Sequence, residues 1–108
     1  MEELIKRLAT FRDARDWAQF HTPENLAKSI MIEGAELLEH FQWDNNYNRE
    51  EMVEELADVM SYCMLMADRL DIDIEQAIHN KIDKNEAKYP ADQVRGSSKK
   101  YTEYKNRS

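Results

Sequence analysis

The residues with the clearest potential for chemistry are two pairs of acidic side chains, with the members of each pair three residues apart. Glu33 and Glu36 form the first pair, and Glu55 and Asp58 form the second, after 18 intervening residues. Residues three apart on a helix are neighbours. Four carboxylates converging from two helices would repel one another and hold raised pKa values unless cations neutralised them. Hard oxygen ligands of this kind favour Mg²⁺, with Mn²⁺ as a substitute, over zinc or copper.

A second interpretation is that these acids only solvate helix faces, and the pattern alone does not separate it from a metal site. A di-iron site is not expected, because it would need a histidine three residues after a glutamate on two helices. Here His40 follows Glu36 by four residues, and His79 follows Glu75 by four. Both histidines are expected to be exposed.

The elements that must position the acids are expected to be helices. The chain has only 2 Gly and 2 Pro and is rich in good helix formers, which favours an all-α fold. Thr22, Asn48 and Asp73 are suited to cap helix starts, and Pro23 suits a first helical position. The pattern predicts helices over residues 2–16, 23–42, 49–70 and 74–89. Because their connections are short, they should pack as an antiparallel four-helix bundle.

Apolar residues at helical spacing place the acids beside the predicted core. On the second helix, Glu33 lies about 20° outside the arc of apolar side chains. On the third helix, Glu55, Asp58 and Tyr62 form a row along the flank of the apolar stripe. The apolar positions are Leu26, Ile30, Leu37 and Phe41 on the second helix, and Met52, Leu56, Val59, Cys63, Ala67 and Leu70 on the third.

Two further groups of side chains could contact a ligand. Lys81, Asn85 and Lys88 lie near the edge of the fourth helix's inward face, which Ile74, Ile78, Ile82 and Tyr89 mark. Taken alone, this basic row favours ion pairs with the acids over contacts with phosphates. An aromatic group at helix ends could sandwich a flat nucleobase, although such side chains are more often hydrophobic plugs. The aromatic group consists of Trp17, Phe20, His21, Trp43 and Tyr62.

Length and charge restrict the remaining possibilities. The chain has 108 residues and a net charge of −7, and residues 1–90 carry 10 basic against 20 acidic side chains. An acidic body is a poor partner for long nucleic acid, and no apolar run approaches the roughly 20 residues that cross a bilayer. A lone cysteine fits a reducing cytoplasm. We expect one domain over residues 1–90 and a basic, flexible extension over 91–108.

The acidic pairs resemble a family signature. Glu33-Gly-Ala-Glu36 and Glu55-Leu-Ala-Asp58 resemble the Glu-x-x-Glu and Glu-x-x-Asp motifs of the MazG-like, all-α nucleoside triphosphate pyrophosphatases. The similarity covers roughly residues 4–90. Within it, the stretches 11–21, 33–43, 54–59 and 81–90 look like the dCTP pyrophosphatase branch.

The resemblance implies a Mg²⁺-dependent enzyme that hydrolyses a dCTP-like or modified deoxynucleoside triphosphate to the monophosphate and pyrophosphate, as house-cleaning of the nucleotide pool. The four acids would be its metal ligands and catalytic groups. The aromatic group would line the nucleoside pocket, and Lys81, Asn85 and Lys88 would bind phosphates. Leu8 stands where dCTP-specific members carry a histidine, which leaves the preferred base open.

The resemblance also implies a homodimer or homotetramer, and the largely apolar segment 59–67 is compatible with helix packing between subunits. Two alternatives remain. The first is a pyrophosphatase of the same type that acts on dUTP, an alarmone or other nucleoside triphosphates. The second is a non-catalytic helical oligomer whose acids bind structural ions or a basic partner protein.

Overall fold

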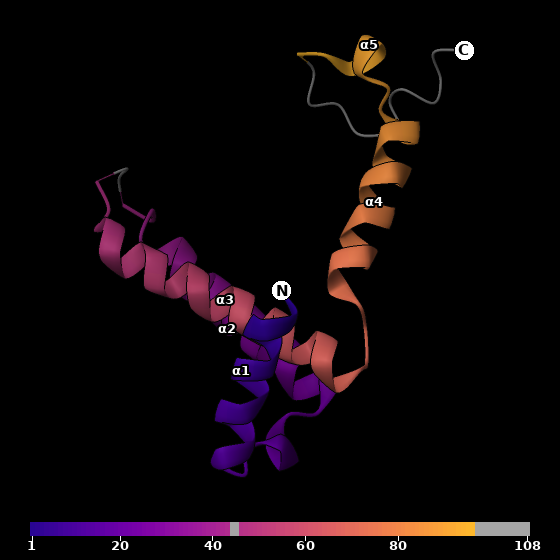
Figure 1. The fold of residues 1–108 in the computed structure, drawn as a ribbon. Helices are drawn as coiled ribbons and strands as arrows, with labels where there is room; N and C mark the ends of the chain where they lie inside the picture. The colour runs from indigo at the N-terminus through magenta and orange to yellow at the C-terminus, as the bar shows by residue number, and fades with distance from the viewer. Residues whose placement is uncertain (44–45, 97–108) are drawn as a thin grey trace. The chain divides into compact units, whose positions relative to one another are not determined.

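The computed structural model describes residues 1–43 and 46–96, and all of their regular secondary structure is helical. This confirms the all-α prediction. The elements are α1 (Glu2–Ala14), the 3₁₀ helix η1 (Ala18–Phe20), α2 (Pro23–Glu39), α3 (Arg49–Arg69), α4 (Ile74–Lys88) and α5 (Ala91–Val94), shown in Figure 1. None of the helices within the described ranges has the length and apolar character needed to cross a membrane.

Three helices begin at the side-chain caps that the sequence predicts. The Thr22 hydroxyl accepts a hydrogen bond from the Asn25 backbone N–H at 3.1 Å, and Pro23 takes the first position of α2. The Asn48 and Asp73 side chains accept equivalent bonds at the starts of α3 and α4, at 3.1 and 3.0 Å. Each cap satisfies a backbone donor that has no partner within its own helix.

Two helices end two or three residues earlier than predicted, and α3 and α4 end one residue earlier. After Glu39, the N–H groups of His40, Phe41 and Gln42 bond to carbonyls three residues back, at 3.3, 2.9 and 3.3 Å, so the chain tightens and leaves the α-helix before residue 42. The first helix ends at Ala14, because Asp16 adopts a left-handed backbone conformation with φ 54°. A left-handed residue cannot continue a right-handed helix.

Residues 1–72 form one compact unit, in which α2 and α3 run antiparallel side by side and α1 packs against α3. Figure 1 shows this arrangement with α2 and α3 joined at one end. The buried core residues of the described chain are Leu26, Met64, Leu65 and Ala67. An ion pair of 2.8 Å between Arg12 Nη1 and Asp68 Oδ2 adds a polar link between α1 and α3.

The buried positions on α3 differ in part from the predicted stripe. Ala67 is buried as predicted, whereas Leu56 and Leu70 are 45% and 46% exposed. Leu70 lies one residue past the end of α3, and within this unit the other helices leave the side of α3 that carries Leu56 uncovered. The predicted apolar stripe on α3 therefore includes residues that stay exposed in the single chain.

Residues from 73 onward form a second unit, with α4 and the short α5. Ile78 and Ile82, predicted to face inward, are 47% and 46% exposed, while Ile74 and Tyr89 are half-buried. Helix α5 falls within the predicted flexible extension, and the rest of that extension, from residue 97, lies outside the described residues. The packing within residues 1–72 joins three long helices, so the four-helix bundle stays a prediction.

Candidate active site

Three of the four predicted acids come together where α2 packs against α3. One carboxylate oxygen each from Glu33, Glu55 and Asp58 lies within 4.8 Å of the others, a spacing at which a single cation can be held. Glu33 and Glu55 are half-buried, whereas Asp58 is exposed. Glu36 is outside this compact trio, and it influences the trio because it raises the pKa of both Glu33 and Glu55. We refer to these four residues as the carboxylate cluster.

The electrostatics of the cluster favour either protonation or a bound cation. Burial raises the pKa of Glu33 to about 7, and the neighbouring carboxylates, Glu36 first among them, act in the same direction. Burial also raises the pKa of Glu55, together with the Glu36 charge, while His40 lowers it. The carboxylates of the cluster therefore repel one another when ionised, and a bound cation would reduce this repulsion.

Two buried oxygens of the carboxylate cluster bear on whether a metal ion fits there. Oε2 of Glu33 and Oε2 of Glu55 are both inaccessible to solvent and have no hydrogen-bond partner among the described residues. Buried carboxylate oxygens without partners carry a large desolvation cost. Carboxylate oxygens are donors of the type that Mg²⁺ and Mn²⁺ prefer. The residues present thus fit a hard divalent cation.

His21 and Tyr62 form a pair beside the cluster. Their ring centroids are 6.5 Å apart in an edge-to-face arrangement, and Nδ1 of His21 is buried without a partner in the described part of the chain. Tyr62 lies one turn after Asp58 on α3, and its pKa is raised by burial and by the charges of Glu33, Asp58 and Glu36. The pKa of His21 is lowered by burial and by the charge of Arg12, which keeps the imidazole neutral at pH 7.

The other predicted aromatic residues are not gathered around this pair. Trp17 stacks edge-to-face on Phe11 with centroids 5.7 Å apart, and Arg15 lies 3.7 Å from the centre of the Phe11 ring. Phe20 is 61% exposed and Trp43 is 87% exposed. No ring contact within residues 1–43 and 46–96 joins these three predicted pocket residues to His21 or Tyr62. The single chain therefore presents only part of the predicted base pocket.

The predicted phosphate-binding residues belong to the second unit. Lys81, Asn85 and Lys88 lie on α4 with exposed side chains, four and three residues apart along the same side of the helix. Their spacing is compatible with a row of donors toward phosphate oxygens. Their role as substrate contacts stays a prediction.

One residue near the acids is absent from the predicted site. His40 was expected to be exposed, but its side chain is only 16% exposed and its Nε2 lies 3.9 Å from Oε1 of Glu55. The four-residue spacing from Glu36 does not indicate that His40 lies near the acids. The seven-residue spacing from Glu33 does indicate it, since residues seven apart fall on nearly the same face of a helix.

Comparisons with a family model and with known proteins point to the same family. The MazG-like family matches residues 28–104. Human dCTP pyrophosphatase 1 is 38% identical over 113 aligned positions, and the mouse protein of the same name is 37% identical. These alignments cover 95% of this chain but 66% of each relative, so the chain spans slightly less than two thirds of their length.

A solved structure agrees with the sequence relatives. A pyrophosphatase from Archaeoglobus fulgidus aligns with a TM-score of 0.79 and 45% sequence identity, over 83% of this chain and 92% of that one. At this identity the likeness extends beyond the fold to the sequence. The chain belongs to the MazG-like family.

Proposed function

We propose that this chain is a Mg²⁺-dependent nucleoside triphosphate pyrophosphohydrolase that converts a dCTP-like or modified deoxynucleoside triphosphate to the monophosphate and pyrophosphate. The observation that carries the proposal is a pair of buried oxygens, on Glu33 and Glu55, that have no hydrogen-bond partner among the described residues and lie within the same cluster as Asp58. The names of the relatives, a dCTP pyrophosphatase and a pyrophosphatase, support the same reaction class.

Different residues would have different roles in this reaction. Glu33, Glu36, Glu55 and Asp58 would hold one or two divalent ions, which when bound polarise phosphoryl oxygens and offset charge on the leaving pyrophosphate. A carboxylate of the cluster accepts the proton of a water molecule whose oxygen attacks phosphorus. As the new P–O bond forms, the bond to pyrophosphate breaks. The half-buried placement of Glu33 and Glu55 limits competing water around these groups.

The substrate would be oriented from two sides. Tyr62, whose pKa the acids raise, and His21, whose ring lies 6.5 Å from that of Tyr62, are proposed to contact the nucleoside, and Trp17, Phe20 and Trp43 are proposed to complete the base pocket. Lys81, Asn85 and Lys88 are proposed to bind the phosphates. Since a lysine is a single point charge, Lys88 would attract a phosphate oxygen without the two-pronged grip of an arginine.

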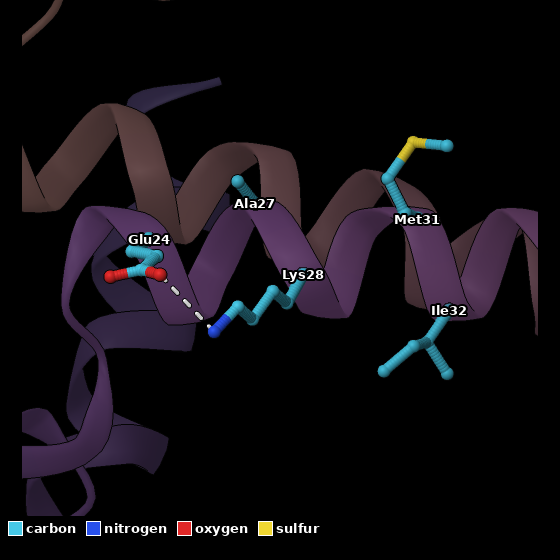
Figure 2. Close-up of a pocket in the computed structure, with 5 residues that line it drawn as sticks. All are labelled: Glu24, Ala27, Lys28, Met31 and Ile32. Atoms are coloured by element: carbon cyan, nitrogen blue, oxygen red, sulfur yellow. Dashed lines mark ion pairs between the residues drawn. The ribbon is translucent and has the colours of Figure 1, made fainter.

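We also propose that the enzyme acts as a homodimer or homotetramer, with α4 completing a four-helix bundle. Large apolar side chains are exposed along α2 and α3, and such surfaces commonly mark interfaces. They include Met31, Ile32, Leu38, Val53, Leu56 and Met60. Figure 2 shows Met31 and Ile32 projecting from α2, where they line a shallow apolar pocket together with Glu24, Ala27 and Lys28. Glu24 and Lys28 form an exposed ion pair of 3.2 Å.

Product analysis tests the activity directly. The full chain is incubated with dCTP, its 5-substituted analogues, dUTP and the common ribonucleoside triphosphates, with and without Mg²⁺. We expect monophosphate and pyrophosphate in equal amounts, formed only with the metal, and the panel identifies the preferred base. Release of orthophosphate without pyrophosphate, or the absence of turnover with every substrate, would contradict the proposal.

Two variants test the assignment of the acids. Glu55→Gln removes a charge from the cluster, whereas Glu54→Gln removes one from the adjacent exposed position on α3. Loss of metal-held phosphate positioning should lower kcat at least about 100-fold in the first variant and leave the second near the parental rate. Equal rates in both variants would refute the metal assignment.

A further inference from the structure

A histidine outside the predicted site lies against the carboxylate cluster. His40 is the first residue after α2, and its backbone N–H donates to the Leu37 carbonyl at 3.3 Å, which keeps it in the last turn. It follows Glu33 by seven residues, so its side chain leaves the helix within about 20° of the Glu33 direction. The same face of α2 therefore carries an acid that enters the cluster and an imidazole two turns later.

The imidazole is close to one oxygen of Glu55. Nε2 of His40 is 3.9 Å from Oε1 of Glu55, and the two side chains are only 16% and 26% exposed. The other oxygen of Glu55, Oε2, is buried and has no hydrogen-bond partner in the described part of the chain. Glu55 thus has one oxygen toward the histidine and a second oxygen available to a cation.

Carboxylates that bind metals are usually held by hydrogen bonds from a surrounding layer of residues, and loss of such a partner typically costs 10- to 100-fold in metal affinity. The His40–Glu55 separation of 3.9 Å is too long for a hydrogen bond, so the role proposed next requires the two side chains to approach by about 1 Å. Resting on the function proposed above, we propose that His40 is a positioning residue that holds the Glu55 carboxylate in the orientation that binds a divalent cation.

The inference is tested by metal binding without substrate. Mg²⁺ is titrated calorimetrically into the full-length protein at pH 8, and Mn²⁺ binding is followed by electron paramagnetic resonance. His40→Leu removes the N–H at similar volume, and His40→Gln retains a donor at the same reach. We expect the leucine variant to bind Mg²⁺ about tenfold more weakly and the glutamine variant to recover most of that loss.

An exposed histidine supplies the matched control. His79 lies on α4 with an exposed side chain, and His79→Leu should bind Mg²⁺ as the parent does. Thermal unfolding in EDTA is measured first, and His40→Ala replaces the leucine variant if that protein does not fold. Loss of affinity without a matching loss of metal-free stability separates positioning from a purely structural role.

Each failure has a different meaning. If His40→Leu binds Mg²⁺ within about twofold of the parent while Asp58→Asn does not bind, the role of His40 is refuted and the proposed function stands. If His40→Gln is as weak as His40→Leu, the N–H is not what holds Glu55. If the parent protein itself binds no Mg²⁺ or Mn²⁺, the proposed function fails.

Discussion

The carboxylate cluster should make the metal-free protein less stable than a variant with one acid removed. Glu33 has an ordinary pKa of 4.5, which burial and its acidic neighbours raise to about 7 in the folded chain. A group with a raised pKa stabilises the fold most when protonated, so its contribution is fully present below pH 4.5 and is lost as the pH rises through 7. At pH 8 the folded protein must keep Glu33 ionised against these neighbours.

The size of the effect follows from that shift. A rise in the pKa of Glu33 from 4.5 to about 7 corresponds to about 3 kcal/mol in the free energy of unfolding. Screening by solvent at a partly exposed site reduces this to about 1–2 kcal/mol. Glu33→Gln, which is neutral at every pH, should therefore raise the thermal midpoint in EDTA at pH 8 by about 5–10 °C. At pH 4 the variant and the parent should unfold within about 2 °C of each other.

Mg²⁺ should reverse this order. A ligand at 100 times its Kd stabilises the folded state by about 2.7 kcal/mol, and only the parent retains the complete cluster. Unfolding is followed by circular dichroism at equal protein concentration, with EDTA or Mg²⁺ at matched ionic strength. The control is Glu39→Gln, which removes an exposed charge from the end of the same helix. A Glu33→Gln variant that is less stable than the parent in EDTA at pH 8, or is stabilised by Mg²⁺ as much as the parent, would refute the reasoning.

Three further predictions concern the frame of the site and its substrate contacts. Arg12→Ala removes the ion pair with Asp68, and the Arg12 side chain is only 11% exposed. This variant should lower the free energy of unfolding by about 1.5–3 kcal/mol in urea titrations. The control Lys28→Ala removes an exposed ion pair and should lower the free energy of unfolding by less than about 1 kcal/mol. Thr22→Ala removes the cap of α2 and should cost about 1 kcal/mol, whereas an unchanged urea midpoint would show that the cap contributes nothing. Trp43→Ala should leave stability within about 0.5 kcal/mol because the ring is 87% exposed. In steady-state kinetics it should mainly raise KM, and a fall in kcat at unchanged KM would place Trp43 outside the base pocket.

The local features of this fold could be predicted from sequence because they depend on neighbouring residues. Thr22, Asn48 and Asp73 each accept a bond from a backbone N–H three residues later, and this geometry needs no other part of the chain. Helical spacing likewise places Glu33 at the edge of an apolar face. The ends of helices were less predictable, since the last turn of α2 tightens through bonds that several residue types permit.

The sequence by itself therefore determined that the chain is helical, where its helices begin and which acids lie beside apolar faces. Only the tertiary structure decided which of these acids meet. The antiparallel packing of α2 and α3 sets their relative height and rotation, which brings oxygens of Glu33, Glu55 and Asp58 within 4.8 Å and His40 to 3.9 Å from Glu55. Those distances depend on how α2 packs against α3, whose buried core residues Leu26 and Leu65 are far apart in the chain, and local spacing does not specify this packing.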